Sequence, residues 1–237
     1  MEIAQMRAIA VIRTDYREKF GIPRQSALVP EALGTIVFEP SFRSDEALRG
    51  LEDFSHLWLI WEFSRSVREK WSPTVRPPRL GGNVRMGVFA TRSPFRPNPV
   101  GLSVVKLEEI RRGTPDGTVL IVSGADMLDG TPIIDIKPYI PYADSVPDAR
   151  GGFASTAPDP TLRVEFPEQL LARVPADKRA ALKAVLALDP RPRYQDDPQR
   201  VYGFQFAEQN VRFRVQDQTL TVLAVESAPA SAPGTDA

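Results

Sequence analysis

The stretch that most clearly indicates the fold is His56-Leu57-Trp58-Leu59-Ile60-Trp61-Glu62-Phe63, a strongly apolar run that begins at the only histidine of the chain. Aromatic and β-branched residues at this density are typical of a β-strand. Because successive side chains of a strand point to opposite faces, Trp58 and Trp61 lie on opposite faces, and one of them belongs to the core. A histidine at the start of such a run is more often a hydrogen-bonded structural residue than a base.

Short runs of the same kind recur on both sides of this strand. Proline, glycine or polar clusters separate them, as in a sheet closed into a barrel or paired in a sandwich. Only residues 44–49 suggest a helical turn, with Ser44 as its cap. Strands do not alternate with long amphipathic helices, which argues against a parallel doubly wound sheet. The chain is therefore predicted to be mainly β, with further strands over residues 8–12, 34–38, 84–90, 101–107, 118–123 and 132–136.

The pattern changes after residue 145. Residues 146–161 are rich in proline, glycine and small polar residues and are predicted to be a linker. Beyond them, residues 168–188 carry leucine and valine at helical spacing, with Pro175 dividing the pattern in two. Alternating strands follow over residues 201–206, 211–215 and 220–225. We therefore expect a first domain over residues 1–145, a small α+β domain over residues 162–226, and a disordered tail over residues 227–237.

Composition excludes several kinds of chemistry. The chain has 237 residues, no cysteine and one histidine. Disulfides, thiolate nucleophiles and cysteine zinc sites are therefore impossible, and a multi-histidine metal centre cannot be built. The glycine fingerprints of Rossmann and P-loop proteins are also missing. No metal is expected, and the reaction must rely on other groups.

The N-terminal residues lack the basic and apolar regions of a signal peptide. No stretch approaches the ~18 apolar residues of a membrane span. We therefore expect a cytoplasmic protein with no membrane partner.

Charge is unevenly distributed in a chain whose net charge is zero. Residues 70–107 contain no aspartate or glutamate. A block of like charges that also contains apolar strand residues indicates a folded basic face for an anion such as RNA. The basic residues of this block are Lys70, Arg76, Arg79, Arg85, Arg92, Arg96 and Lys106.

Four segments rich in proline or glycine carry polar side chains at the predicted strand ends. In Lys19-Phe20-Gly21-Ile22-Pro23-Arg24-Gln25, an arginine and a glutamine on a proline turn can bind a carboxylate and an adenine edge. The second segment, residues 51–63, contains the apolar strand. In the third, residues 76–101, prolines bracket Arg96 and Asn98, which indicates a preorganised site. In the fourth, residues 124–139, two aspartates form a turn before a strand with Asp135, Lys137 and Tyr139 on one face.

Together these segments resemble the TsaA-like, or TrmO, family of tRNA methyltransferases. The family signatures P-R-Q, G-L-x-x-F-S-H-x-W, R-x-x-x-R-P-N-P-x-G and D-x-x-D-G-T-P-x-x-D-I-K-P-Y all occur in order between residues 11 and 145. The later segments Asp189-Pro190-Arg191-Pro192-Arg193-Tyr194 and Val201-Tyr202-Gly203-Phe204 resemble the C-terminal domain of the bacterial branch.

The resemblance implies an antiparallel β-barrel, unlike the Rossmann methyltransferases, that binds S-adenosylmethionine at a homodimer interface. It also implies N6-methylation of N6-threonylcarbamoyladenosine at position 37 of threonine-decoding tRNA. Ser64 stands where family members often have histidine. The positions that match cofactor-binding segments of the family are Pro23, Arg24, Gln25, Ser64, Arg65, Arg92, Leu102, Asp126, Met127, Leu128 and Asp129.

Roles on the substrate side are hypotheses from the residue types. Asn98, Asp135 and Tyr139 are the candidate catalytic groups, because proton loss from N6 can be assisted by a nearby oxygen acceptor. The C-terminal domain is expected to help seat the tRNA. The candidate contacts to the anticodon stem-loop are Arg76, Arg79, Arg85, Arg96 and Lys137.

Two alternatives remain open. One is an RNA-binding barrel that has kept the fold and lost the chemistry. The other is a methyltransferase acting on a small molecule, for which the basic block would be an unexplained excess of charge.

Overall fold

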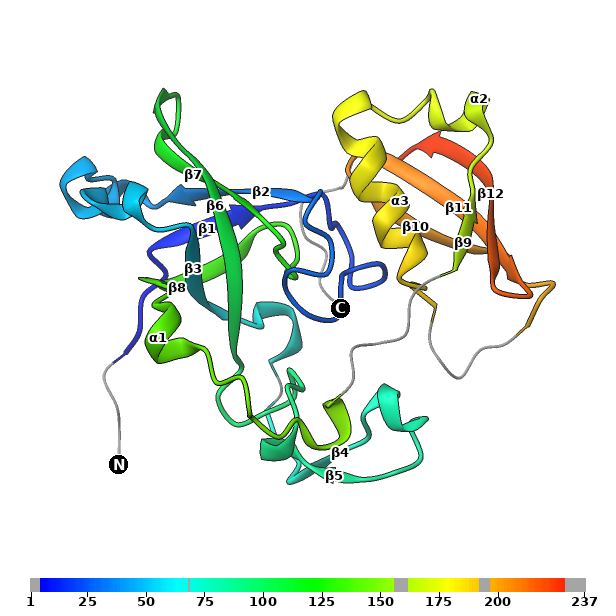
Figure 1. Ribbon diagram of the computed structural model, residues 1–237, viewed down its shortest axis with the longest axis horizontal. Coiled ribbons are helices and arrows are strands. Elements are labelled where there is room, and N and C mark those ends of the chain that lie inside the picture. The colour runs from blue at the N-terminus through cyan, green and yellow to red at the C-terminus, as the bar shows by residue number, and fades with distance from the viewer. Residues whose placement is uncertain (1–4, 68, 156–161, 192–196, 229–237) are drawn as a thin grey trace.

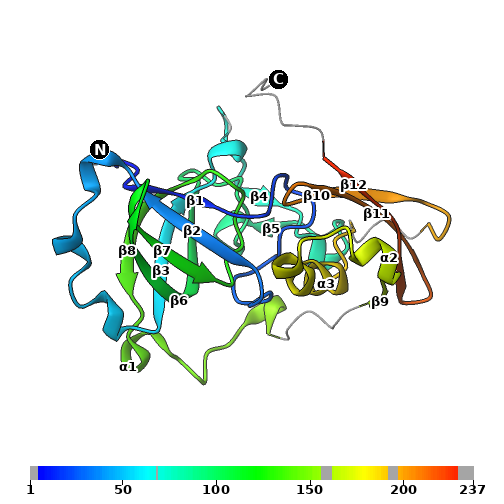
Figure 2. The same cartoon turned by 90° about the horizontal axis from the view of Figure 1, so that it is seen from above.

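The computed structural model describes residues 5–67, 69–155, 162–191 and 197–228. It shows two units side by side, a barrel and a smaller C-terminal unit (Figures 1 and 2). The end of the expected linker, the end of the motif at residues 189–194 and most of the expected tail lie outside the described residues. Within the described residues, no helix is both long enough and apolar enough to span a membrane.

The N-terminal unit is a closed barrel in which every neighbouring pair of strands is antiparallel. The order around the barrel is β1-β2-β7-β6-β3-β8. The mainly β prediction and the antiparallel barrel are therefore confirmed. The strands are β1 (Ala10–Arg13), β2 (Leu33–Phe38), β3 (His56–Glu62), β6 (Val100–Thr114), β7 (Gly117–Ser123) and β8 (Thr131–Pro138).

The alternation along β3 decides which side chains fill the barrel. Leu57 and Leu59 are fully buried, and Trp61 is 6% exposed. Trp58 lies on the outer face, so one tryptophan belongs to the core, as predicted. The indole Nε1 of Trp61 donates a hydrogen bond of 3.0 Å to Ser103 Oγ on β6.

Gly101 on β6 lies directly opposite Trp61. A Cβ atom at this position would be 2.2 Å from Trp61 Cε2, well inside van der Waals contact. The indole therefore occupies the space that any larger residue at position 101 would need.

Three features of the barrel unit differ from the prediction. Residues 84–90 form only the short β5 (Met86–Gly87) and a 3-10 turn, and β5 pairs with β4 (Thr74–Val75) outside the barrel. Of the apolar side chains here, Val88 is buried while Val84 and Phe89 are exposed, so the run lacks a core-facing side. Ser44 precedes a 3-10 turn and makes no side-chain capping bond. Strand β6 continues beyond residue 107 as one arm of a long hairpin with β7, and its charged residues there give no apolar run from which a strand could be predicted.

The C-terminal unit contains the predicted strands as β10 (Tyr202–Phe206), β11 (Gln209–Gln216) and β12 (Thr219–Ser227). An additional strand, β9 (Arg163–Glu165), pairs parallel to β12 and was not predicted, because three residues are too few to show a pattern. Pro175 separates two helices, as expected. Within the described residues, the α-helices are α1 (Pro141–Asp144), α2 (Glu168–Leu171) and α3 (Arg179–Ala187).

Residues 14–32 leave the barrel after β1 and run between the two units (Figure 1). Tyr16, Val29 and Ala32 are buried in the core of the C-terminal unit, and Phe20 and Ile22 pack against it. The segment 14–32, although it belongs to the N-terminal unit by sequence, therefore has its apolar side chains in the other core.

Polar contacts join the same segment to the C-terminal sheet. The Ala207 amide donates to the Asp15 carbonyl at 2.8 Å, and the Gln205 amide donates to Glu18 Oε1 at 2.8 Å. Gly21 has a φ of 91°, and a Cβ atom there would be 2.5 Å from the Phe204 ring. Both the backbone conformation and the close ring therefore require glycine.

We expect Gly101→Ala to destabilise the barrel, because the added methyl group cannot be accommodated without moving Trp61. Overpacking of this kind costs about 1–3 kcal/mol. Urea unfolding of the variant should show a lower midpoint. Gly87→Ala is the matched control, since a Cβ atom there meets nothing within 4 Å; equal midpoints for wild type and Gly101→Ala would contradict this packing.

Candidate functional site

A cavity of about 2110 Å³ lies between the barrel loops, the β4–β5 extension and the C-terminal unit. Two acidic residues, Glu69 and Asp189, line it, and Asp189 pairs with Arg191 at 2.9 Å. The excess of positive charge makes the cavity suited to an anionic ligand. The basic residues of the lining are Lys19, Arg24, Arg76, Arg79, Arg85, Arg92, Arg96, Arg150 and Arg191.

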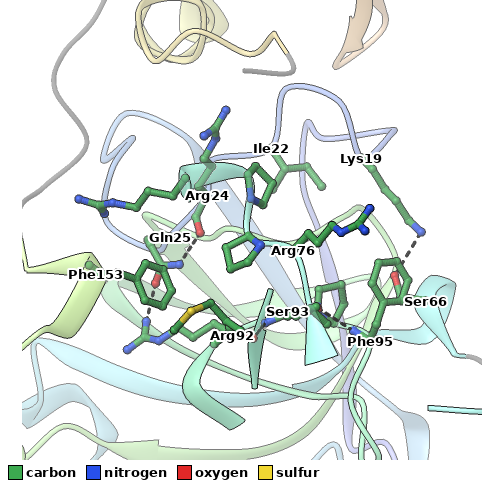
Figure 3. A pocket seen from close by; sticks show the side chains of 18 of the residues that line it. Lys19, Ile22, Arg24, Gln25, Ser66, Arg76, Arg92, Ser93, Phe95 and Phe153 are labelled. Carbon is green, nitrogen blue, oxygen red and sulfur yellow. Dashed lines mark hydrogen bonds between the residues drawn. The ribbon is translucent and has the colours of Figure 1, made fainter. Parts of the chain in front are cut away.

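The Pro-Arg-Gln turn forms one wall of this cavity. Pro23 is buried, and Gln25 lies between Arg24 and Arg92 (Figure 3). The side-chain Nε2 of Gln25 donates to the Arg24 backbone carbonyl at 2.6 Å, and Gln25 Oε1 accepts a hydrogen bond from Arg92 Nη1. Gln25 thereby couples the turn to the arginine of the second loop.

Lys19 connects the turn to the end of β3. Its Nζ donates to the Arg65 carbonyl at 2.6 Å and to Ser66 Oγ at 3.2 Å. Ser66 lines the cavity, whereas Ser64 and Arg65 are exposed and lie outside the lining. Residues 64–65 therefore lie beside the cavity, and the hydrogen bond from Lys19 to the Arg65 carbonyl links them to its wall.

A chain of hydrogen bonds begins at Trp61 in the barrel core and ends at Asp126, which is partly buried. Trp61 donates to Ser103, and Ser103 Oγ donates to Asp126 Oδ1 at 2.6 Å. Burial raises the pKa of the Asp126 carboxyl, and hydrogen bonds from Ser103 and the Ser26 backbone and the charge of Arg92 oppose this rise. Asp126 is thus next to the 24–26 loop and within the electrostatic reach of Arg92.

Met127 and Asp129, which follow Asp126 in the sequence, both contact Thr14. Asp129 Oδ1 accepts from the Thr14 amide at 3.0 Å, and its other oxygen pairs with Arg17. The Met127 side chain is 1% exposed in the barrel core, and its carbonyl accepts from Thr14 Oγ1 at 3.1 Å. Leu128 is partly buried. These residues fix the start of the 14–32 segment, and Asp126 to Asp129 do not line the cavity.

Leu102 and Asp135 lie on the outer face of the barrel. Both pair with Ile60 on β3, whose neighbours Leu59 and Trp61 point inward. Leu102 is 55% exposed. Within one copy of the chain, these two residues are therefore separate from the cavity.

The other substrate-side candidates are also outside the cavity lining. Lys137 forms an ion pair of 2.9 Å with Asp135, and Tyr139 packs against Trp58 with ring centroids 5.9 Å apart. Asn98 is exposed, and its carbonyl accepts from the Val100 amide at 2.7 Å. The shared face predicted for residues 135, 137 and 139 is present, on the outside of β8.

The four arginines predicted to contact tRNA all line the cavity: Arg76, Arg79, Arg85 and Arg96. The Arg96 guanidinium donates to the Thr91 carbonyl at 3.1 Å, which fixes its position.

Sequence reasoning did not select the aromatic residues of the lining, Phe20, Trp71, Phe89, Phe95 and Phe153. Three of them fall in the acid-free block, so aromatic residues interspersed among arginines were the available signal. In the described part of the chain, histidine, aspartate and glutamate do not form a group of three or more that could hold a metal ion.

Comparison with known proteins agrees with this arrangement. Residues 11–145 match the tRNA-methyltransferase O N-terminal domain, and residues 159–228 match the TrmO C-terminal domain. The Escherichia coli (strain K12) protein named tRNA (adenine(37)-N6)-methyltransferase is 44% identical over 95% of this chain and 99% of its own length. A Pseudomonas aeruginosa protein, provisionally named an S-adenosylmethionine-dependent methyltransferase, is 47% identical over 86% of this chain and 90% of its own length.

A crystal structure of TrmO from Pseudomonas aeruginosa superposes with a TM-score of 0.78 at 38% identity, covering 96% of this chain and 99% of that one. Both family models, the sequence relatives and the solved structure cover the barrel and the C-terminal unit together. The chain therefore belongs to the tRNA-methyltransferase O family.

Proposed function

We propose that this chain is an S-adenosylmethionine-dependent methyltransferase that modifies N6 of adenine 37 in tRNA. The observation that carries the proposal is one cavity in which the Gln25–Arg92 pair faces an arginine-rich wall. The Escherichia coli relative is named for this reaction. Membership of the same family over nearly the full chain supports transfer of the activity.

The polar groups at the cavity fit S-adenosylmethionine. The guanidinium groups of Arg24 and Arg92 suit its carboxylate, since arginine binds a carboxylate through paired hydrogen bonds. Gln25 can pair with an adenine edge. Asp126, which lies next to the 24–26 loop outside the cavity lining, remains our candidate for binding an ammonium group or a ribose diol. When bound, this cofactor supplies an activated methyl group on a sulfonium.

The protein contributes alignment and charge. Pro23 and the prolines of residues 94–99 restrict the backbone of their loops. The side chains that these loops carry are therefore positioned before the substrate binds. Asn98, Asp135 and Tyr139 remain our candidates for receiving the N6 proton. Because they lie outside the cavity of a single copy, this assignment is linked to the assembly of the protein.

The outer face of β3, β6 and β8 supports a homodimer. Cross-strand neighbours Ile60 and Leu102, and Trp58 and Val104, form an apolar surface there. Exposed Leu102 would be removed from water if a second copy covered this face. We propose that Asp135 and Tyr139 then lie at the interface between copies.

For the substrate, we propose N6-threonylcarbamoyladenosine in threonine-decoding tRNA. The threonylcarbamoyl group carries a carboxylate, and Arg96 is an arginine of the cavity held by its hydrogen bond to Thr91. Arg150 and Arg191 extend the same wall toward the C-terminal unit, which supports a tRNA-binding role for that unit. We also propose a cytoplasmic location, where tRNA is available as a substrate.

The direct test is transfer of labelled methyl from S-adenosylmethionine to tRNA, followed by nucleoside analysis. Label should appear at position 37 in N6-methyl-N6-threonylcarbamoyladenosine, the product formed when the methyl group replaces the N6 proton. Arg92→Ala should weaken cofactor binding by about 1.5–3 kcal/mol, or roughly ten- to a hundredfold, because a charge-assisted bond is lost. Arg111→Ala is the control, since Arg111 pairs with Glu109 on the β6–β7 hairpin. If tRNA binds but no methyl group is transferred, the chain is a non-catalytic RNA-binding barrel. If the label appears in a small molecule, the chain is a methyltransferase that acts on small molecules.

Asp126→Asn should separate stability from cofactor binding. Burial raises the pKa of Asp126 above its ordinary value of 3.8, so the folded state holds this proton more tightly than the unfolded state. The contribution of Asp126 to stability therefore falls as pH rises through its folded-state pKa. Asparagine keeps an acceptor for Ser103 and does not titrate. Relative to wild type, the variant should gain unfolding free energy from acidic to neutral pH while its affinity for S-adenosylmethionine falls.

Urea unfolding at several pH values and calorimetric titration of the cofactor measure both quantities. The exposed Asp53→Asn is the matched control. A stability difference between Asp126→Asn and wild type that is the same at every pH would contradict the buried position of the charge.

Asn98→Ala and Tyr139→Phe test the substrate-side assignment. If these groups assist proton removal, turnover should fall on the order of a hundredfold with cofactor affinity unchanged. Single-turnover methylation measures the effect, with Tyr142→Phe as control because Tyr142 is 91% exposed outside the cavity. The assignment fails if both variants keep full turnover.

A further inference from the structure

Two large aromatic side chains are exposed inside the cavity. Trp71 is 50% exposed and Phe89 is 73% exposed, and both belong to the cavity lining. Their ring centroids are 6.2 Å apart, and the ring planes are inclined by 32°. The two rings are therefore neighbours with moderately tilted planes, and both are open to solvent.

The backbone holds these rings in place. Trp71 precedes β4 and Phe89 follows β5, and the two strands pair through Thr74–Gly87 and Val75–Met86. Beyond the strands, the Val88 amide donates to the Pro73 carbonyl at 2.9 Å. Val88 itself is 1% exposed and anchors the turn that carries Phe89. The paired strands and the buried Val88 therefore hold Phe89 in its exposed position.

The surroundings of the rings are positively charged. Arg76, Arg85 and Arg92 line the same cavity, and residues 70–107 contain no acidic residue. A ligand that combines flat apolar faces with negative charge matches both features. An unpaired strand of RNA has this combination, because its bases stack on aromatic rings and its phosphates pair with arginine.

A second copy of the chain is a poorer match. Two copies related by a twofold axis would bring the same patch against itself. Arg76, Arg85 and Arg92, which line the cavity together with the rings, would then face the same arginines of the other copy, and like charges repel.

We propose that Trp71 and Phe89 form a stacking platform for an unpaired base of the anticodon loop beside the adenine that is modified. This inference rests on the proposed function, since it assigns a base-binding site within the same cavity. The arginines hold the backbone of the loop, and the platform distinguishes an open loop from a paired stem. Double-stranded RNA keeps its bases stacked on one another and cannot use the platform.

The test is binding of the full-length protein to two RNAs, a hairpin with the anticodon loop and a blunt duplex with the same stem. Phe89→Ala and Trp71→Ala should each weaken hairpin binding about tenfold or more and leave duplex binding unchanged. Phe89→Tyr and Trp71→Phe keep a flat ring and should bind as wild type does. Tyr142→Ala is the matched control, because Tyr142 is exposed outside the cavity.

Salt dependence separates stacking from phosphate contact. Phe89→Ala should shift hairpin affinity equally at every salt concentration, whereas Arg85→Ala should reduce the slope of log affinity against log salt by about one. Thermal unfolding midpoints equal to wild type establish that the variants are folded.

The inference is overturned if both alanine variants bind the hairpin as wild type does, if they lose hairpin and duplex equally, or if their oligomeric mass changes with RNA affinity intact. The methyl-transfer assay keeps the two claims apart. Ring-dependent hairpin binding without methyl transfer refutes only the proposed function. Methyl transfer with an unchanged KM for tRNA in both variants refutes only the platform.

Discussion

Burial of residues 14–32 in the C-terminal core is the interaction on which the candidate site depends. Tyr16 and its neighbours have their apolar side chains in that core, while Thr14 is held by Met127 and Asp129 of the barrel unit. The turn at residues 23–25 is therefore fixed from both sides. Removing the C-terminal unit would expose apolar side chains and release this turn, so the unit supports the Gln25 side of the cavity as well as its outer wall.

A second constraint runs through the barrel interior. The space left by Gly101 admits the Trp61 indole, and Trp61 holds Ser103, which holds Asp126. The carboxyl next to the 24–26 loop is thus positioned by the core packing of the barrel. Burial raises the pKa of this carboxyl and so disfavours its charged form, and shifted pKa values of this kind are typical of groups retained for binding or chemistry.

Much of the fold could be predicted from alternation alone. Residues 56–63 and their counterparts became barrel strands, and the parity of Trp58 and Trp61 assigned one ring to the core. The same parity places Leu102 and Asp135 on the outer face, away from the cavity of one copy.

The destination of residues 14–32 could not be predicted, because their apolar pattern shows that they are buried and does not show in which core. Residues 84–90 have the apolar pattern of a barrel strand yet form only β5 outside the barrel, because an apolar run does not show whether a sheet edge is available. Within the site, the arginines of the acid-free block predict one wall of the cavity. The exposed rings of Trp71 and Phe89 could not be predicted, because an aromatic residue in a sequence does not show whether its ring is buried or exposed.

A crystal structure of the protein with S-adenosylhomocysteine tests the central claim most directly. The account predicts the ligand in the cavity, with its carboxylate on Arg24 or Arg92 and its adenine edge within reach of Gln25. It also predicts that the Trp71–Phe89 surface stays open beside the ligand. Electron density for the ligand at another surface, with Gln25 and Arg92 uncontacted, would contradict it.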